Sequence, residues 1–445
     1  MLRYPVSNVT QIPLLELEKI MVRAERLKET WTGSSDVVVA PRHTYQSDIP
    51  SDLLNNRPVA VMGEYIVFKN PVSEWGPTVF SFVWMLNNWG QRPIAFQYRI
   101  AKIHNQYRSV SSAFHMNCSS QTFYIVDTLY NAQAPSDRIV KFVGIGIGPG
   151  GPRITTERQI PGPHSGQFML RISDFFVYTF QSATGRGDLN PGDVEIHVWE
   201  IRTGEAFKLF LQAPHWATVD GIPHGKNKLY LSENLLVLKH GLRFTVYSPW
   251  KVPGSPTEPM KPQPVFHGLL PPGTLESYSI FPSPISSTSF TLLCFPGGVG
   301  AEIENTHIQL WSIEDSGSGW SMKELKHLRF PSRELYMRSS CLKSCPGAHY
   351  ALGIFSKEGH RDRNRKQFYT VHLDLSPTQD TTTRSFLNLR EITIPPFSGN
   401  GSHWVSAAHF DPFSGKFLFH SGNMLANSNV LAGPKTITIL DFLGF

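Results

Sequence analysis

Seven strongly apolar segments of similar appearance recur along most of this 445-residue chain. They begin at Thr78, Arg138, Asp193, Leu242, His307, Gln367 and Thr436 and read TVFSFVWM, RIVKFVGI, DVEIHVWEI, LRFTVYSPW, HIQLWSIE, QFYTVHLDL and TITILDFL. The steps between their first residues are 60, 55, 49, 65, 60 and 69 residues. This recurrence indicates that one supersecondary unit is repeated, with loops of varying length between its copies. Such units bury their apolar faces against one another, so the repeat restricts the fold more than any single segment does.

Each of these segments is flanked by further strand-like runs. A shorter apolar run precedes each one, for example Val59–Lys69 before the first and Gly415–His420 before the last. Another strand pattern follows each of the first six, as at Ile94–Ile103 and Leu387–Ile394. The unit is therefore about four strands, which is the content of one β-propeller blade. The 35 glycines and 34 prolines agree with many short strands joined by turns.

The last repeat reaches Phe445 after only its third strand, whereas an unassigned β segment, Val37–Tyr45, lies near the start of the chain. Pairing this segment with Thr436–Phe442 completes the seventh blade and removes the open edges of the array. The sequence thus predicts an all-β, seven-bladed, WD40-like β-propeller over residues 35–445, closed by its N-terminal strand. Nothing in the pattern divides the propeller into smaller domains.

Residues 1–34 form a separate predicted segment whose main feature is an α-helix from Leu14 to Trp31. Apolar residues recur there at steps of three and four, which is the helical period. They are Leu17, Ile20, Met21, Ala24, Leu27 and Trp31. Gly33 with the serines that follow it provides a stop signal. Because this apolar stripe is continuous, we expect it to pack against the side of the propeller.

Two stretches resemble known families. The fragment IHVWEIRTGE, Ile196–Glu205, resembles the third strand and turn of a WD40 blade, and Trp311 and the pair Asp411 and Gly415 are weaker echoes. The stretch PLLELEKIMVRAERLKETWTG, Pro13–Gly33, resembles the segment that follows the F-box in F-box proteins of mushroom-forming fungi, where it leads into a WD40-like propeller. The resemblance implies a substrate receptor of an SCF-type ubiquitin ligase. The Skp adaptor is then an expected partner only if an F-box is supplied upstream, because the residues before this helix are too few to form one.

Two groups of residues invite a chemical interpretation. The glycines of Gly144–Gly150 suggest a phosphate-binding loop, but the stretch that follows, Arg153–Gln159, does not have a helical pattern, so we predict a turn between two strands. Cys341, Cys345 and His349 suggest a metal site, but they leave a tetrahedral ion one ligand short. The sequence therefore predicts no catalytic, cofactor-binding or metal-binding residue and no cofactor.

Charge and targeting signals favour an intracellular protein without a nucleic-acid partner. The net charge is +6, but its Lys and Arg residues are scattered. The densest basic loop contains Arg361, Arg363, Arg365 and Lys366, interrupted by Asp362. We find no signal peptide, no apolar stretch long enough to span a bilayer, and too few cysteines for a disulfide framework. We expect a cytoplasmic or nuclear location.

The function that we expect is non-enzymatic binding of another protein on a propeller face, with rim aromatics such as Trp89 as possible anchors. The alternative is a propeller hydrolase that acts on glycans. Two carboxylates about 5 to 10 Å apart at the mouth of the channel would favour this enzyme. An aromatic and basic rim would favour the binding module.

Overall fold

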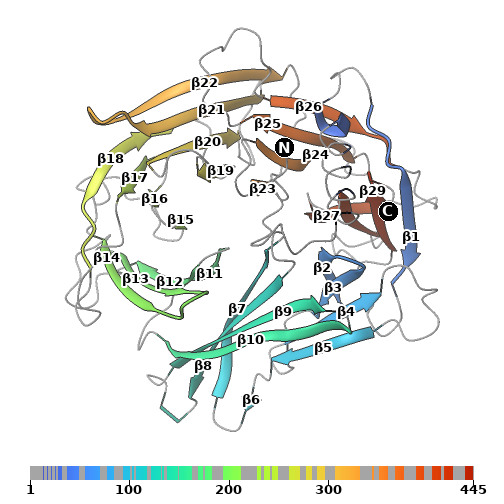
Figure 1. Cartoon of the computed structure of the whole chain (residues 1–445), viewed down its shortest axis with the longest axis horizontal. Helices are drawn as coiled ribbons and strands as arrows, with labels where there is room; N and C mark the ends of the chain where they lie inside the picture. Colours follow the sequence, from blue (N-terminus) through green and yellow to red (C-terminus); the bar gives the residue numbers. More distant parts are fainter. Residues whose placement is uncertain are drawn as a thin grey trace.

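The computed structural model shows a ring of seven β-sheets (Figure 1). It describes residues 14, 18, 22, 26, 29–32, 38–49, 56–70, 78–84, 94–100, 103–104, 107–117, 122–131, 133–134, 138–148, 150–162, 169–173, 176–182, 194–211, 228–231, 235–240, 243–248, 260–270, 277–282, 288–295, 306–330, 343–344, 350–358, 366–374, 387–394, 403–411, 415–423 and 436–443. Within these residues nearly every element is a strand. The predicted all-β, seven-bladed propeller is confirmed.

The blades follow one another around the ring in chain order. Blade 1 contains β2 (Arg57–Met62), β3 (Tyr65–Lys69), β4 (Thr78–Trp84) and β5 (Ile94–Ile100). Blade 2 contains β6 (Ile103–His104), β7 (Tyr107–Asn117), β8 (Thr122–Asn131), β9 (Arg138–Gly148) and β10 (Gly151–Pro161). Blade 3 contains β11 (Met169–Ile172), β12 (Phe176–Ser182), β13 (Val194–Glu200) and β14 (Ala206–Leu211). Blade 4 contains β15 (Lys228–Leu231), β16 (Leu236–His240), β17 (Arg243–Tyr247) and β18 (Pro264–Leu269).

The remaining blades complete the ring. Blade 5 contains β19 (Ser277–Pro282), β20 (Ser289–Phe295), β21 (Thr306–Asp315) and β22 (Trp320–Phe330). Blade 6 contains β23 (Lys343–Ser344), β24 (Tyr350–Glu358), β25 (Lys366–Asp374) and β26 (Leu387–Ile392). Blade 7 contains β27 (His403–Asp411), β28 (Lys416–Asn423), β29 (Thr436–Asp441) and β1 (His43–Asp48). The seven segments that revealed the repeat are β4, β9, β13, β17, β21, β25 and β29, which are the third strands of their blades when the count in the five-stranded blade 2 starts at β7.

The ring closes through the N-terminal strand, as predicted, but that strand begins later than expected. β1 pairs antiparallel with β29 from His43 opposite Asp441 to Asp48 opposite Thr436. Val39, which the sequence predicts in the same strand, instead forms a parallel bridge with Ile392 of blade 6. Pro41 separates the two pairings and has no N–H to donate to a ladder. The N-terminal segment therefore joins blade 6 to blade 7 as well as closing the ring.

The hydrophobic core lies in the seams between blades, because each sheet is apolar on both faces. The seam between blades 1 and 2 brings the Phe82 and Phe123 rings edge to face, with centroids 5.8 Å apart. Equivalent clusters join blades 3 and 4, blades 4 and 5, and blades 7 and 1. Each blade is thus stabilised mainly by its neighbours.

The turn in blade 3 has the geometry that its WD40-like sequence predicts. Gly204 has a positive φ of 76° and donates its N–H to the carbonyl of Glu200 at 2.8 Å. The Thr203 hydroxyl donates to the Glu200 carboxylate at 3.1 Å and accepts from the Glu205 N–H at 3.1 Å. Glycine adopts this φ without the steric cost that a Cβ would impose.

The chain returns to blade 4 after β17, since β17 and β18 pair in one sheet. Met260 forms a parallel bridge with Leu209 of blade 3, with hydrogen bonds to the backbone of Lys208 and Phe210 at 2.8 Å each. This bridge resembles the one formed by Val39, since both add a short extended piece to the outer strand of a blade. The structure thus uses chain excursions to cover outer strand edges.

Substitution of Gly268 in β18 tests the packing of the outer strand in blade 4. Gly268 lies opposite Phe244, and a Cβ at Gly268 would come within 2.1 Å of the ring. Since Phe244 is buried, we expect Gly268→Ala to lower the free energy of unfolding by about 1 to 3 kcal/mol. Gly150→Ala is the control, because no atom lies within 4 Å of its Cβ position. Equal melting temperatures for the two variants would contradict this packing.

Candidate interaction surfaces

The N-terminal segment docks on blades 6 and 7 through Trp31. This side chain is 0% exposed, stacks on Phe410 at 5.4 Å and meets Phe442 edge to face at 5.0 Å. The Arg390 guanidinium of β26 donates a hydrogen bond to the carbonyl of Thr30. Trp31 therefore acts as the anchor of the segment, and Arg390 binds the carbonyl of the residue before it.

The described part of the predicted helix is helical and has one solvent-exposed side. Residues 14, 18, 22, 26 and 29–32 have helical geometry. Leu14 is 72% and Val22 45% exposed, whereas Trp31 is fully buried. Val22 and Trp31 are separated by nine residues, or about two and a half helical turns, which places them on opposite sides. The predicted stripe of Leu17, Ile20, Met21, Ala24 and Leu27 lies outside the described residues, so its packing stays a prediction.

The glycine-rich run is located mostly inside a strand. Gly144, Gly146 and Gly148 belong to β9, the turn lies at Gly150, and β10 follows as predicted. The Cβ positions of Gly144 and Gly146 would contact Thr155, so close packing accounts for these glycines. A strand rather than a helix follows the run, which contradicts a dinucleotide-binding loop.

The other candidates from the sequence lie where no side chain is described. These are Cys341, Cys345, His349, Arg361, Arg363, Arg365, Lys366 and Trp89; of these, only the backbone of Lys366 is placed, at the start of β25. Among the described side chains, no three His, Cys, Asp or Glu residues converge as metal ligands. In the same part of the chain, no helix combines the length and the apolarity needed to cross a membrane.

Buried charges in blade 7 form a row across its strands. Lys416 lies opposite Asp411 on one side and Asp441 on the other, and both aspartates are 0% exposed. The Lys416 ammonium donates to the carbonyl of Gly63 in blade 1 at 3.4 Å. The two buried carboxylates thus lie on either side of a lysine that reaches across the seam between blades 7 and 1. Removal of one member of such a row is costly because it leaves another charge buried.

A second polar cluster lies in the seam between blades 1 and 2. The Lys69 ammonium donates to the Ser112 hydroxyl at 3.4 Å and lies over the Phe80 and Phe114 rings at 5.8 and 5.5 Å. Burial lowers the pKa of Lys69, and nearby Asp127 opposes that change. An amine held against aromatic faces in this way gains a cation–π attraction. The sequence showed no signal for this cluster, because its members come from different blades.

Lys141 forms the outer part of the same seam. It is paired with Glu157 at 2.7 Å and lies over the Tyr98 ring at 5.9 Å. Burial alone would lower the pKa of Lys141, but the hydrogen bond with Glu157 and the contact with Tyr98 raise it. Burial also raises the pKa of Tyr98, although Lys141 opposes this. The ion pair with Glu157 joins Lys141 to the next strand of blade 2, and the contact with Tyr98 joins it to blade 1.

Blade 3 has a partly exposed group of three ionisable side chains. Glu195 binds the His197 Nε2 at 2.8 Å and the Lys208 ammonium at 2.7 Å. The hydrogen bond from His197 lowers the pKa of Glu195, burial opposes it, and Lys208 lowers it further, to about 2. The folded state therefore favours the ionised carboxylate.

The group around Glu195 has a consequence for acid stability. The pKa of Glu195 is about 2 when folded and 4.5 ordinarily, so its contribution is complete above pH 4.5 and is lost as the pH falls towards 2. We expect Glu195→Gln to flatten the dependence of unfolding free energy on pH in this window. Lys208→Met removes a partner that lowers the pKa of Glu195, so the loss of unfolding free energy at low pH should be complete at a higher pH. Denaturant titrations at several pH values measure both effects. The same dependence of unfolding free energy on pH in parent and Glu195→Gln would contradict the assignment.

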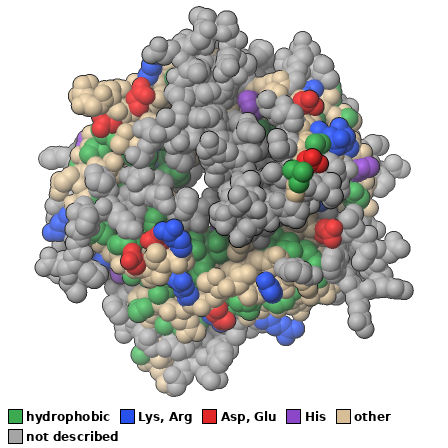
Figure 2. All heavy atoms as spheres, viewed as in Figure 1, with side chains coloured by type: hydrophobic (Ala, Val, Ile, Leu, Met, Phe, Trp, Pro, Cys, Tyr) green, Lys and Arg blue, Asp and Glu red, His purple; other side chains and the backbone are tan. Residues whose placement is uncertain are grey.

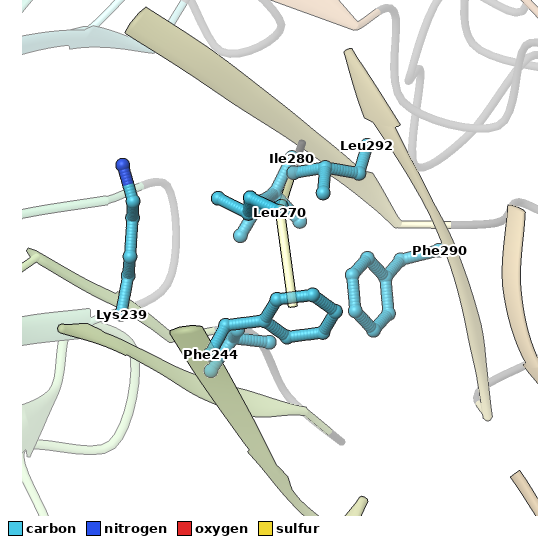
Figure 3. Close-up of a pocket in the computed structure, with 7 residues that line it drawn as sticks. Lys239, Phe244, Leu270, Ile280, Phe290 and Leu292 are labelled. Carbon is cyan, nitrogen blue, oxygen red and sulfur yellow. The ribbon is translucent and has the colours of Figure 1, made fainter. Parts of the chain in front are cut away.

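The best-defined cavity among the described residues is apolar and lies between blades 4 and 5. It is lined by Val237, Lys239, Phe244, Leu270, Ile280, Phe290 and Leu292. The apolar side chains gather on one side, while Lys239 stands apart from them (Figure 3). The cavity has room for about one water molecule, which is far less than a ligand pocket needs. Burial raises the pKa of the neighbouring Cys294 to about 12, so its thiol is not a ready nucleophile.

One face of the ring has a central opening, with described charges of both signs around it (Figure 2). No protein-family model matches the chain, and no curated protein is similar to it in sequence. Solved structures with a similar fold include the WD40 domain of SCAP from fission yeast, at 9% identity and a TM-score of 0.37, covering 88% of this chain and 85% of that chain. Another is oligopeptidase B from Trypanosoma brucei, at 9% identity and a TM-score of 0.39, covering 95% of this chain and 52% of that chain.

A third is the periplasmic gluconolactonase PpgL from Pseudomonas aeruginosa, at 11% identity and a TM-score of 0.37, covering 89% of this chain and all of that one. These neighbours include a WD40 domain and two enzymes. Similarity at this level concerns the fold and says nothing about function. The chain is a seven-bladed β-propeller with WD40-like structural neighbours.

Proposed function

We propose that this chain is a non-enzymatic scaffold that binds another protein in the cytoplasm or nucleus. One observation carries the proposal: the described carboxylates that are fully or almost fully buried belong to seams between blades. Asp411 and Asp441 flank Lys416 within blade 7, and Asp127 lies beside Lys69 between blades 1 and 2. A glycosidase needs two carboxylates that face its substrate, whereas each of these three is buried beside a lysine.

Within this role, we propose that the chain is the substrate-recognition part of an SCF-type ubiquitin ligase when an F-box is present upstream. The resemblance of Pro13–Gly33 to a post-F-box segment supports this step, and so does the packing of Trp31, which would fix the direction of an upstream module relative to the propeller. Binding of the Skp adaptor would then depend on residues before the helix rather than on the propeller.

Affinity purification of the tagged chain from the cells that produce it tests the scaffold and the ligase separately. We expect a stoichiometric protein partner, accompanied by the Skp adaptor and a cullin subunit when the tagged protein carries an F-box upstream. A stoichiometric partner without these two subunits, even with an F-box upstream, would contradict the ligase role and keep the scaffold. A panel of chromogenic glycosides is assayed with the same preparation. Saturable hydrolysis that copurifies with the chain through two further columns would overturn the non-enzymatic assignment.

A further inference from the structure

Charged residues at the ends of the strands differ in sign between the two ends of this propeller. We call the entry end the end at which the first and third strands of each blade begin and the second and fourth strands finish, with the count in blade 2 starting at β7. Seven basic residues and two acidic residues occupy the strand-terminal positions there. The basic residues are Arg57, Lys69, Arg138, Lys228, Arg243, Lys343 and Lys366, and the acidic ones are Glu358 and Asp48.

The opposite end has the reverse composition. Five acidic residues and one basic residue occupy its strand-terminal positions in the first three strands of the blades. They are Glu200, Asp315, Asp374, Asp411 and Asp441, with Lys416 between the last two. Charges of one sign gathered at one end of a ring create a field that attracts a partner of the opposite sign. The entry end therefore favours an acidic partner.

Blade 1 contains a local conflict in this pattern. Arg57 and Lys69 lie directly opposite each other on β2 and β3. Two like charges at directly opposed positions destabilise a sheet. Arg57 is exposed and begins the innermost strand of its blade, so a neutral residue there would serve the fold better. A local cost of this kind is expected where the residues serve binding.

The surroundings of Lys69 make it a fixed cation. Its ammonium is held by the Ser112 hydroxyl and the Phe80 and Phe114 rings. Phe114 belongs to β7 of blade 2 and is 37% exposed. Arg57, Lys69 and Phe114 thus place two cations beside a partly exposed aromatic ring, near the inner strands. Asp127 already lies near Lys69, so a carboxylate that reaches this place binds the exposed Arg57 first and adds to the negative charge beside Lys69.

We propose that the entry end of blades 1 and 2, centred on Arg57 and Lys69, binds an acidic segment of a partner protein. This inference rests on the proposed scaffold function and names the chemistry of its partner. The carboxylates of the segment pair with Arg57 and Lys69, and Arg138 and Arg243 at the same end draw the segment towards the ring. Binding weakens as salt is added, because the pairs are close to solvent.

Arg57→Gln in the full chain tests the proposal, with Arg202→Gln as the matched control. Arg202 lies at the opposite end, its side chain is 88% exposed, and its substitution changes the net charge equally. The probes are fluorescent decaglutamate and decalysine peptides and a single-stranded oligodeoxynucleotide of the same length, measured by anisotropy at low and physiological ionic strength. We expect Arg57→Gln to weaken decaglutamate binding about tenfold or more, which is about 1.4 kcal/mol. Arg202→Gln should change it less than twofold.

Thermal melting separates a binding role from a structural one. Because Arg57→Gln removes a like-charge pair, its melting temperature should equal or exceed that of the parent. A lower melting temperature, or equal loss of binding in both variants, would overturn the proposal. Tighter binding of the oligodeoxynucleotide than of decaglutamate would replace the protein partner with a nucleic acid. If decaglutamate does not bind but a stoichiometric protein still copurifies, this surface is wrong and the scaffold function stands.

Discussion

Trp31→Ala should lower the free energy of unfolding of the chain by about 3 to 5 kcal/mol, as expected when a large aromatic side chain is removed from a core. The side chain is fully buried and contacts Phe410 and Phe442, so its loss leaves a void between the N-terminal segment and blade 7. Urea unfolding followed by circular dichroism measures the change. Trp31 Nε1 is buried without a hydrogen-bond partner in the described part of the structure, so Trp31→Phe should retain much of the stability.

Thr32→Ala is the matched control for Trp31→Ala. Thr32 is the next residue in the chain, is helical and is exposed, so its substitution should change the unfolding free energy by less than about 0.5 kcal/mol. If Trp31→Ala unfolds at the same urea concentration as the parent, the N-terminal segment does not dock on blades 6 and 7. Its apolar stripe would then be available to an upstream module or to a partner.

Deletion of His43–Asp48 should have an effect of several kcal/mol and should also reduce the cooperativity of unfolding. The deletion removes the backbone hydrogen bonds that pair β1 with β29, and it leaves β29 as an exposed edge. It also removes Tyr45, which packs against the apolar seam between blades 7 and 1. Calorimetry measures the melting temperature and the ratio of calorimetric to van't Hoff enthalpy.

A replacement variant separates the backbone from the side chains in this strand. Substituting His43–Asp48 with alternating threonine and serine keeps a strand that can pair with β29 but lacks the original side chains. We expect this variant to melt between the parent and the deletion. A deletion variant with the melting temperature of the parent would show that the ring does not need β1 for closure.

The fold could be predicted from the sequence because its signal repeats. Each third strand is apolar on both faces, and seven copies at similar steps leave few alternatives to a closed ring. The start of the closing strand was misplaced because Val37–Tyr45 has strand-forming residues on both sides of Pro41, and the pattern does not tell which strand each half joins. Only the tertiary structure assigns Val39 to blade 6.

The candidate interaction surface could not be read from the sequence in the same way. Arg57 and Lys69 flank a short hairpin whose turn contains Gly63 and Glu64, and this hairpin could have revealed their opposition. The contacts of Lys69 with Ser112 and Phe114 could not, since they cross from one blade to the next. Pairwise contacts between blades depend on how far each blade is twisted, and no local pattern encodes that angle.

The pairing of β1 with β29 also sets the order of events during synthesis of the chain. His43 leaves the ribosome long before its partner Asp441, and at about 5 to 20 residues per second the interval is roughly 20 to 80 s. During this time β1 has no strand to pair with, and the apolar face of blade 1 that later meets blade 7 is uncovered. The nascent chain is therefore exposed to wrong strand pairing until blade 7 is complete. Chaperones that act on nascent chains should matter more for this protein than for a domain whose contacts are local.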